Sequence, residues 1–202
     1  MTGTNKQTIS NDSAFRLLSF WFEELAPKDW FIQRDAVDEA LAKKFGQLIE
    51  PASAGDLDHW LDDPQTGLAL IIVLDQLPRN LRRGSAAAFE HDPKALAASR
   101  HFIAHHRAAF DAMTPQQKLF VLLPFEHAED REAQAEAVGW FEHFAPQMTG
   151  DDAVFWADVT DYGHRHREPI ERFGRFPHRN QVMGRDTTAA EAAWLEQHPN
   201  GF

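Results

Sequence analysis

The segment DPQTGLALIIVLDQLPRN, residues 63–80, holds the longest apolar run of the chain and decides the fold class. Its β-branched residues would also suit a buried strand. However, Asp63 precedes Pro64, and a capping residue before proline at the first helical position is a helix-start signal. No other segment has the pattern of a partner strand. We therefore expect a helix that is apolar on all sides and fully buried.

Similar start signals recur along the chain. They are Asp92 before Pro93, Thr114 before Pro115 with Gln117 completing a capping box, and Thr188 with Glu191 as a second box. Asn11 or Asp12 is expected to cap the first helix. Apolar residues recur at three- and four-residue steps in 15–22, 37–48, 133–144 and 155–162. The sequence predicts an all-α protein of eight or nine helices, with a disordered N-terminal tail at 1–10 and a single helical domain at 11–202.

Composition limits the possible functions. The chain has 202 residues and no cysteine, which excludes disulfides, thiolate zinc sites and cysteine nucleophiles. Its net charge of −11 argues against nucleic acid as a partner. The longest apolar run is too short to span a membrane, and the first ten residues are polar, unlike a secretory signal. We expect a cytoplasmic protein without a membrane partner.

Arginine is concentrated in two segments of this acidic chain. Nine of the fourteen arginines lie within residues 79–83 and 165–185. In LDQLPRN, residues 74–80, and in RFGRFPHRN, residues 172–180, Arg and Asn closely follow a proline. Pro78 is expected to end or kink its helix, and Pro124 likewise. The arginines then either bind free helix carbonyls and the protein's own acids, or converge on an anion.

Convergence would create a pocket of mixed charge. The predicted ligand-binding residues are Asp75, Arg79, Asn80, Arg83, Arg175, His178, Arg179, Asn180 and Arg185, and the candidate acid or base residues are His127, His178 and Glu126.

The first hypothesis is a binding protein for an anionic small molecule or a peptide group. The alternatives are an enzyme that acts on an anionic metabolite, and a purely structural cluster. In the enzyme, Arg79 and Arg179 would hold the anion while His127 or His178 moves a proton. We expect Arg179 to face a pocket. We expect a structural role for Arg79, since Asp75 stands four residues before it.

Metal and cofactor sites are not predicted. The chain has eleven histidines, but no HExxH motif, no P-loop and no glycine-rich dinucleotide motif. His101, His105 and His106 are expected on a solvated helix face. The six tryptophans are expected in the core.

Three motifs resemble those of the DUF924 family. They are DQLPRN at 75–80 followed by Arg83-Gly84 and AFEHDPKAL at 88–96, PFEHAED at 124–130, and FGRFPHRN at 173–180 followed by Gly184-Arg185 and Thr188. The resemblance extends over about residues 12–197. The chain departs from the family pattern at Leu77, Ala128 and Met183, which stand where phenylalanine, serine and leucine are usual. The resemblance implies an all-helical fold similar to tetratricopeptide-like helical hairpins, and it implies no reaction.

Overall fold

The apolar segment forms a central buried helix in the computed structural model, which describes residues 10–199 and 201. Helix α4 spans Pro64–Leu81, and the Asp63 carboxylate accepts hydrogen bonds from the backbone N–H groups of Gln65 and Thr66. Every residue from Thr66 to Pro78 is buried. The predicted helix start and its burial on all sides are both confirmed.

The described residues contain helices and no strand, which confirms the all-α prediction. The first helix begins at Asn11 rather than after it, and Ser10 precedes it without a side-chain cap. The predicted tail at 1–10 lies outside the described residues, apart from the exposed Ser10. The other helices are α1 Asn11–Ser19, α2 Asp35–Phe45, α3 Ile49–Ala54, α5 Asp92–His105, α6 Arg107–Ala112, α7 Pro115–His127, α8 Arg131–Phe144, α9 Asp151–Phe173 and α10 Ala189–Leu195, with a π-helical turn at Phe20–Glu24 and short 3₁₀ turns between them.

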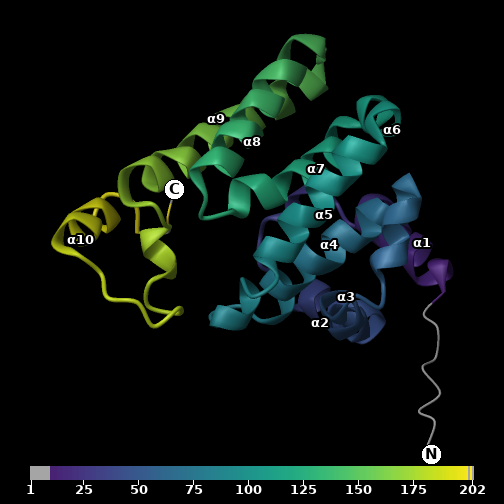
Figure 1. Ribbon diagram of the computed structural model, residues 1–202, viewed down its shortest axis with the longest axis horizontal. Helices are drawn as coiled ribbons and strands as arrows, with labels where there is room; N and C mark the ends of the chain where they lie inside the picture. Colours follow the sequence, from purple (N-terminus) through teal and green to yellow (C-terminus); the bar gives the residue numbers. More distant parts are fainter. Residues whose placement is uncertain (1–9, 200, 202) are drawn as a thin grey trace, which may run out of the picture.

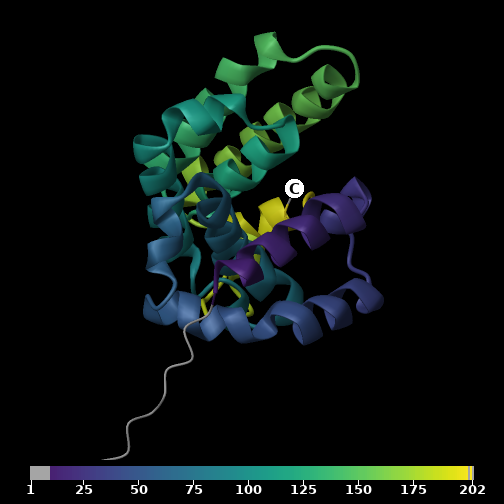
Figure 2. The ribbon, with the colours of Figure 1, turned by 90° about the vertical axis from the view of Figure 1, so that its right-hand side faces the viewer.

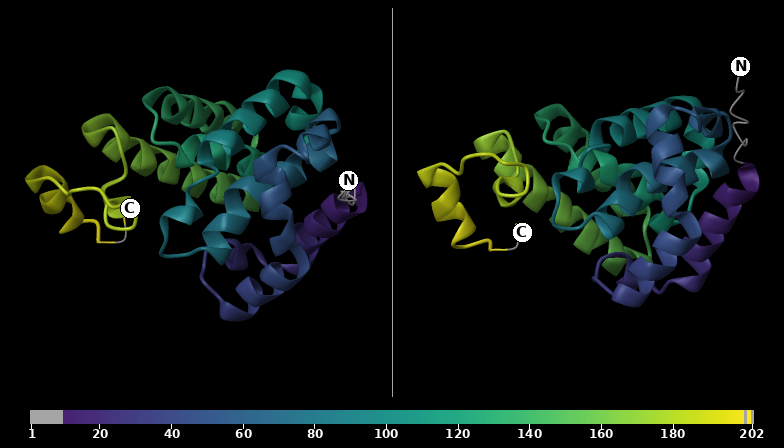
Figure 3. Two further views of the ribbon diagram at one scale, coloured as in Figure 1. Left: turned by 60° about the horizontal axis from the view of Figure 1, so that its bottom comes forward. Right: turned by 90° about the horizontal axis from the view of Figure 1, so that it is seen from below.

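Helix α4 is surrounded by other helices. It packs against α1, α3, α5 and α7, while α8 packs between α7 and α9 (Figures 1 and 2). Helices α1 and α10 lie at opposite ends of the molecule (Figures 1 and 3). Consecutive helices such as α7 and α8, or α8 and α9, pack side by side, an arrangement compatible with helical hairpins.

The two prolines do not end their helices. Pro78 lies inside α4, which continues to Leu81, and Pro124 lies inside α7, which continues to His127. A proline removes only one backbone hydrogen bond of the ladder. Near Pro78 a side chain adds support, because Arg79 Nη1 donates to the main-chain oxygen of Asp75 at 2.9 Å.

The residues predicted to cap helices do not all do so. Thr114 and Thr188 both form capping boxes, as predicted. Asp92, predicted as a cap, is instead the first residue of α5, and no side chain caps this helix. The Asp92 carboxylate is therefore available for contacts outside its own helix.

A glycine sets the close packing of α8 on α9. A Cβ atom at Gly163 would lie 2.6 and 2.7 Å from two ring carbons of the buried Phe141. Gly163→Ala is expected to lower the free energy of unfolding, because overpacking costs about 1–3 kcal/mol and exceeds the gain of about 1 kcal/mol in helix propensity. Gly139→Ala, in α8 with open space around it, is the control and should stabilise by about 0.5–1 kcal/mol. Urea denaturation measures both; equal effects of the two changes would contradict the packing argument.

Candidate functional site

A cavity of about 570 Å³ opens at the C-terminal ends of α4 and α7. Helix α9 and the segment before α2 close its other sides. Its walls are formed by Pro27, Trp30, Phe31, Gln76, Arg79, Asn80, Arg83, Leu119, Leu123, Glu126, His127, Phe155, Asp158, Val159, Tyr162 and His166. Part of the lining is thus apolar, and the rest, here called the polar wall, consists mainly of charged and amide side chains.

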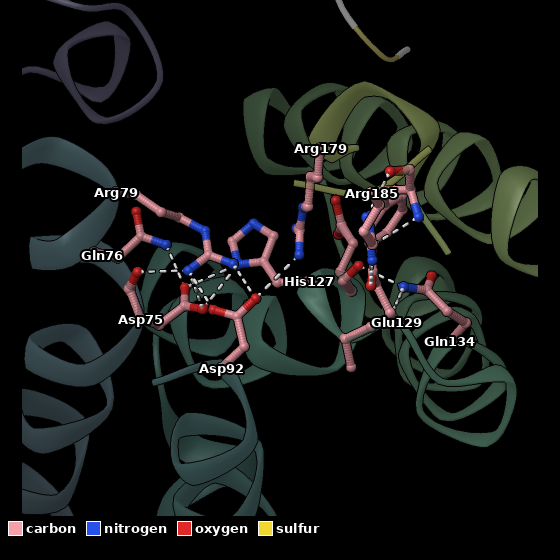
Figure 4. Close-up of polar contacts among 12 residues, drawn as sticks. Asp75, Gln76, Arg79, Asp92, His127, Glu129, Gln134, Arg179 and Arg185 are labelled. Carbon is pink, nitrogen blue, oxygen red and sulfur yellow. Dashed lines mark hydrogen bonds and ion pairs between the residues drawn. The ribbon is translucent and has the colours of Figure 1, made fainter. Parts of the chain in front are cut away.

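The two proline-arginine segments meet at one carboxylate beside this cavity (Figure 4). Arg79 binds both oxygens of Asp92, at 2.8 and 2.9 Å, in a two-pronged ion pair. Arg179 donates to one of the same oxygens at 3.1 Å. Asp92 therefore joins α4, the start of α5 and the segment after α9.

Arg179 lies in the interior. Its exposed fraction is 6%, and its guanidinium lies over the rings of Phe89 and Phe176, at 4.3 and 4.5 Å from their centroids. Burial and the nearby charge of Arg79 lower the pKa of Arg179 to about 10, so it stays charged at neutral pH. Arg179 does not line the cavity, contrary to the expectation from the sequence, whereas Arg79 lines it and is also paired with Asp75, as the sequence predicted.

Asp75 and His127 form a buried pair on the other side of Arg79. Nδ1 of His127 lies 2.9 and 3.0 Å from the two Asp75 oxygens, and Arg79 Nη1 lies 3.3 Å from one of them. Burial favours the neutral acid, but Arg79 and His127 together hold the pKa of Asp75 well below its usual range. Burial, followed by the charge of Arg79, lowers the pKa of His127 below its usual 6.5. The neutral imidazole therefore donates its Nδ1 proton to the Asp75 carboxylate.

Two further pairs lie at the polar wall. Asp38 of α2 accepts a hydrogen bond from Asn80 Nδ2 at 2.9 Å and is paired with Arg83 at 3.2 Å. Glu126 lies 2.8 Å from Nδ1 of His166 in α9. The acidic and basic groups of this wall are therefore largely matched.

Two ion pairs and a hydrogen bond hold the C-terminal segment in place. Arg175 binds Glu191 at 2.6 Å, Arg185 binds Glu129 at 2.5 Å, and Asn180 donates to Thr187 at 3.3 Å. Of the predicted residues, Arg79, Asn80, Arg83, Glu126 and His127 line the cavity, whereas Asp75, Arg175, His178, Arg179, Asn180 and Arg185 do not.

Several residues of the site were missed from the sequence. The sequence predicts Asp92 as a helix cap and places it in the motif at 88–96, but neither feature marks it as the partner of two arginines. Asp38, Asp158, Tyr162 and His166 belong to helices with no distinctive motif, so no sequence signal marks them. The spacing of Asp158, Tyr162 and His166 at four-residue steps is a weak indication that they share one helix face.

The described residues form neither a metal-binding cluster nor a membrane-spanning helix. Within residues 10–199 and 201, no three histidine or acidic side chains come together in a way that could hold a metal ion. None of the helices in the described part of the chain combines the length and the apolar character that crossing a membrane requires.

Comparison with known proteins identifies the family. The family model described as "Bacterial protein of unknown function (DUF924)" matches residues 17–199. A solved structure of a protein of unknown function from Agrobacterium tumefaciens is similar over 93% of this chain and 99% of its own, with 33% sequence identity and a TM-score of 0.80. No curated protein matches the chain. The match over most of the length agrees with the motifs at 75–96, 124–130 and 173–188, and the chain belongs to the DUF924 family.

Proposed function

We propose that the cavity binds a small molecule or a peptide group that carries a carboxylate or a phosphate. The observation that carries this proposal is the position of Arg79, Asn80 and Arg83 in the wall of a cavity of about 570 Å³. That volume is typical of small-molecule sites, which combine apolar walls with a few convergent polar groups.

Arg83 is the residue best placed to contact the anion. Its side chain is 39% exposed, whereas that of Arg79 is 15% exposed and is bound by Asp75 and Asp92. In the described part of the chain, Arg83 makes its ion pair with Asp38 through Nη2. Its other two nitrogens can then donate to a carboxylate or a phosphate, for which the guanidinium has the matching geometry.

The ligand also needs an apolar body. Trp30, Phe31, Leu119, Leu123 and Phe155 supply the apolar part of the cavity lining. Phe31 is 57% exposed, and its ring stacks parallel to that of the buried Phe120. An aromatic or aliphatic ligand would cover this exposed ring while its charged end lies at Arg83.

The second candidate is an enzyme that uses the same cavity. It is favoured by the Asp75–His127 pair, because a histidine held by a buried carboxylate is an arrangement suited to proton transfer. The third hypothesis is a structural cluster. It applies to Asp92 and the two arginines that it binds, since Arg179 is buried there.

An anion titration tests the binding proposal. The melting temperature should rise with phosphate or with an aromatic carboxylate, since a ligand that binds only the folded state stabilises it by about 2.7 kcal/mol at a hundred times its Kd. Arg83→Gln should remove this rise. Arg82→Gln is the matched control, because Arg82 pairs with Glu50 and Glu90 and does not line the cavity. An equal rise in both variants would refute the assignment of Arg83.

A further inference from the structure

His127 is held at the cavity wall in a defined orientation. Its side chain is 14% exposed, and Nδ1 is bound to Asp75. No hydrogen bond within the described residues engages its Nε2. Because the neutral ring carries its proton on Nδ1, the lone pair is on Nε2.

Burial and the two charged neighbours of His127 act in opposite directions on its protonation, and burial is the largest influence. Asp75 favours the imidazolium, while Arg79 on the other side of Asp75 opposes it. Glu126 and His166 form a second carboxylate–imidazole pair nearby, and the rings of His127 and His166 are 6.2 Å apart. Both histidines line the same cavity.

We propose that His127 is a general base that removes a proton from the anionic ligand, and that Asp75 is its positioning residue. The proposal rests on the binding function above and adds a reaction class to it. The proton leaves an acidic O–H, N–H or C–H group of the ligand and forms the Nε2–H bond, and the electron pair of the broken bond stays on the ligand. Asp75 stabilises the resulting imidazolium through Nδ1–H. The substrate class is a small organic acid or phosphate ester with a labile proton.

Alkylation by iodoacetate tests whether Nε2 reacts with an anionic reagent in the cavity. The lone pair of Nε2 attacks the CH₂ carbon, a C–N bond forms, the C–I bond breaks and iodide leaves. Iodoacetate carries the required carboxylate, and the chain has no cysteine to compete for it. Peptide mass spectrometry locates the modified residue, and the exposed His59 and His143 serve as internal controls.

We expect His127 to be carboxymethylated at least about tenfold faster than His59 or His143, since binding beside the base raises its effective concentration. The rate should saturate with iodoacetate, fall when phosphate competes, and persist below pH 6.5 because the pKa of His127 is lowered. Modification of the exposed histidines alone would overturn the proposal.

Two comparisons separate this proposal from the binding function. If iodoacetate and the neutral iodoacetamide modify His127 equally fast, Nε2 is reactive but the anion site, and with it the anionic substrate, fails. If anions raise the melting temperature but His127 is not modified, the anion site stands and the base fails. Asp75→Asn should slow alkylation of His127 while leaving His59 and His143 unchanged. If this variant does not fold, Arg83→Gln, with Arg82→Gln as control, still shows whether the carboxylate of the reagent is held.

Discussion

Asp92→Ala is expected to lower the free energy of unfolding by about 3–5 kcal/mol, because it leaves the buried Arg179 without its ion-pair partner and Arg79 with Asp75 alone. Asp92 binds Arg79 and Arg179, whose side chains are 15% and 7% exposed. The unpaired charge is one part of the loss. The other part arises because α4, α5 and the segment after α9 lose the contact that joins them. The small contribution of Asp92 to the dipole of α5 adds less than about 1 kcal/mol.

Urea denaturation of Asp92→Ala measures this loss. Asp161→Ala is the matched control, because Asp161 pairs with a single arginine, Arg165, and both side chains are more than half exposed. Such surface pairs contribute about 0–1 kcal/mol. A loss of less than about 1 kcal/mol in Asp92→Ala would mean that the junction does not stabilise the fold.

Acidification is expected to destabilise the protein before the carboxylates of Asp75 and Glu129 titrate. Burial, with the charge of Arg179 next, lowers the pKa of His178 from 6.5 to about 4. The pKa of His127 is lowered as well. Between these values and 6.5, the unfolded chain binds protons that the folded chain does not, so stability falls as pH falls from 6.5 to about 4. For His178 the full effect is about 3 kcal/mol.

Stability measured at several pH values between 7 and about 4.5 tests this expectation. His178→Gln should flatten the curve in this window, whatever its effect at pH 7. His143→Gln, at an exposed position, should leave the slope unchanged. Above about pH 5 the Asp75 and Glu129 carboxylates contribute little, since their lowered pKa values move their effect to more acidic conditions. A slope that His178→Gln does not change would contradict the assignment.

The helices were predictable because their signals are local. Asp63 caps α4 and Thr114 caps α7 through contacts within three residues, and a buried helix needs only a continuous apolar run. Asp92 could contact either its own helix or a distant segment, and for this residue the local interpretation was wrong. Asp92 has the features of a helix cap in sequence, but its carboxylate binds two arginines that are 13 and 87 residues away along the chain.

The candidate site was predictable only in part, because its contacts join residues that are far apart in the sequence. Arg79 and Asn80 lie in the last turn of the buried helix α4 and Arg83 follows it, and their motif marked them. The proline-arginine motif after α9 looks similar in sequence, yet Arg179 is buried between two phenylalanine rings. Similar residue patterns thus have different exposure, which depends on the tertiary packing around them. His166 faces the cavity only because α9 crosses beside α7.

The central claim is that the two arginine motifs have separate roles, with Arg179 structural and Arg83 at the ligand. Melting temperatures of wild type, Arg179→Lys and Arg83→Gln, each with and without phosphate, test it most directly. Lysine keeps the charge of Arg179 but cannot reproduce its planar contacts with Asp92 and the two rings. Arg179→Lys should therefore melt several degrees lower and still respond to phosphate, and Arg83→Gln should melt near wild type and not respond. A phosphate response that is lost in Arg179→Lys and kept in Arg83→Gln would contradict the account.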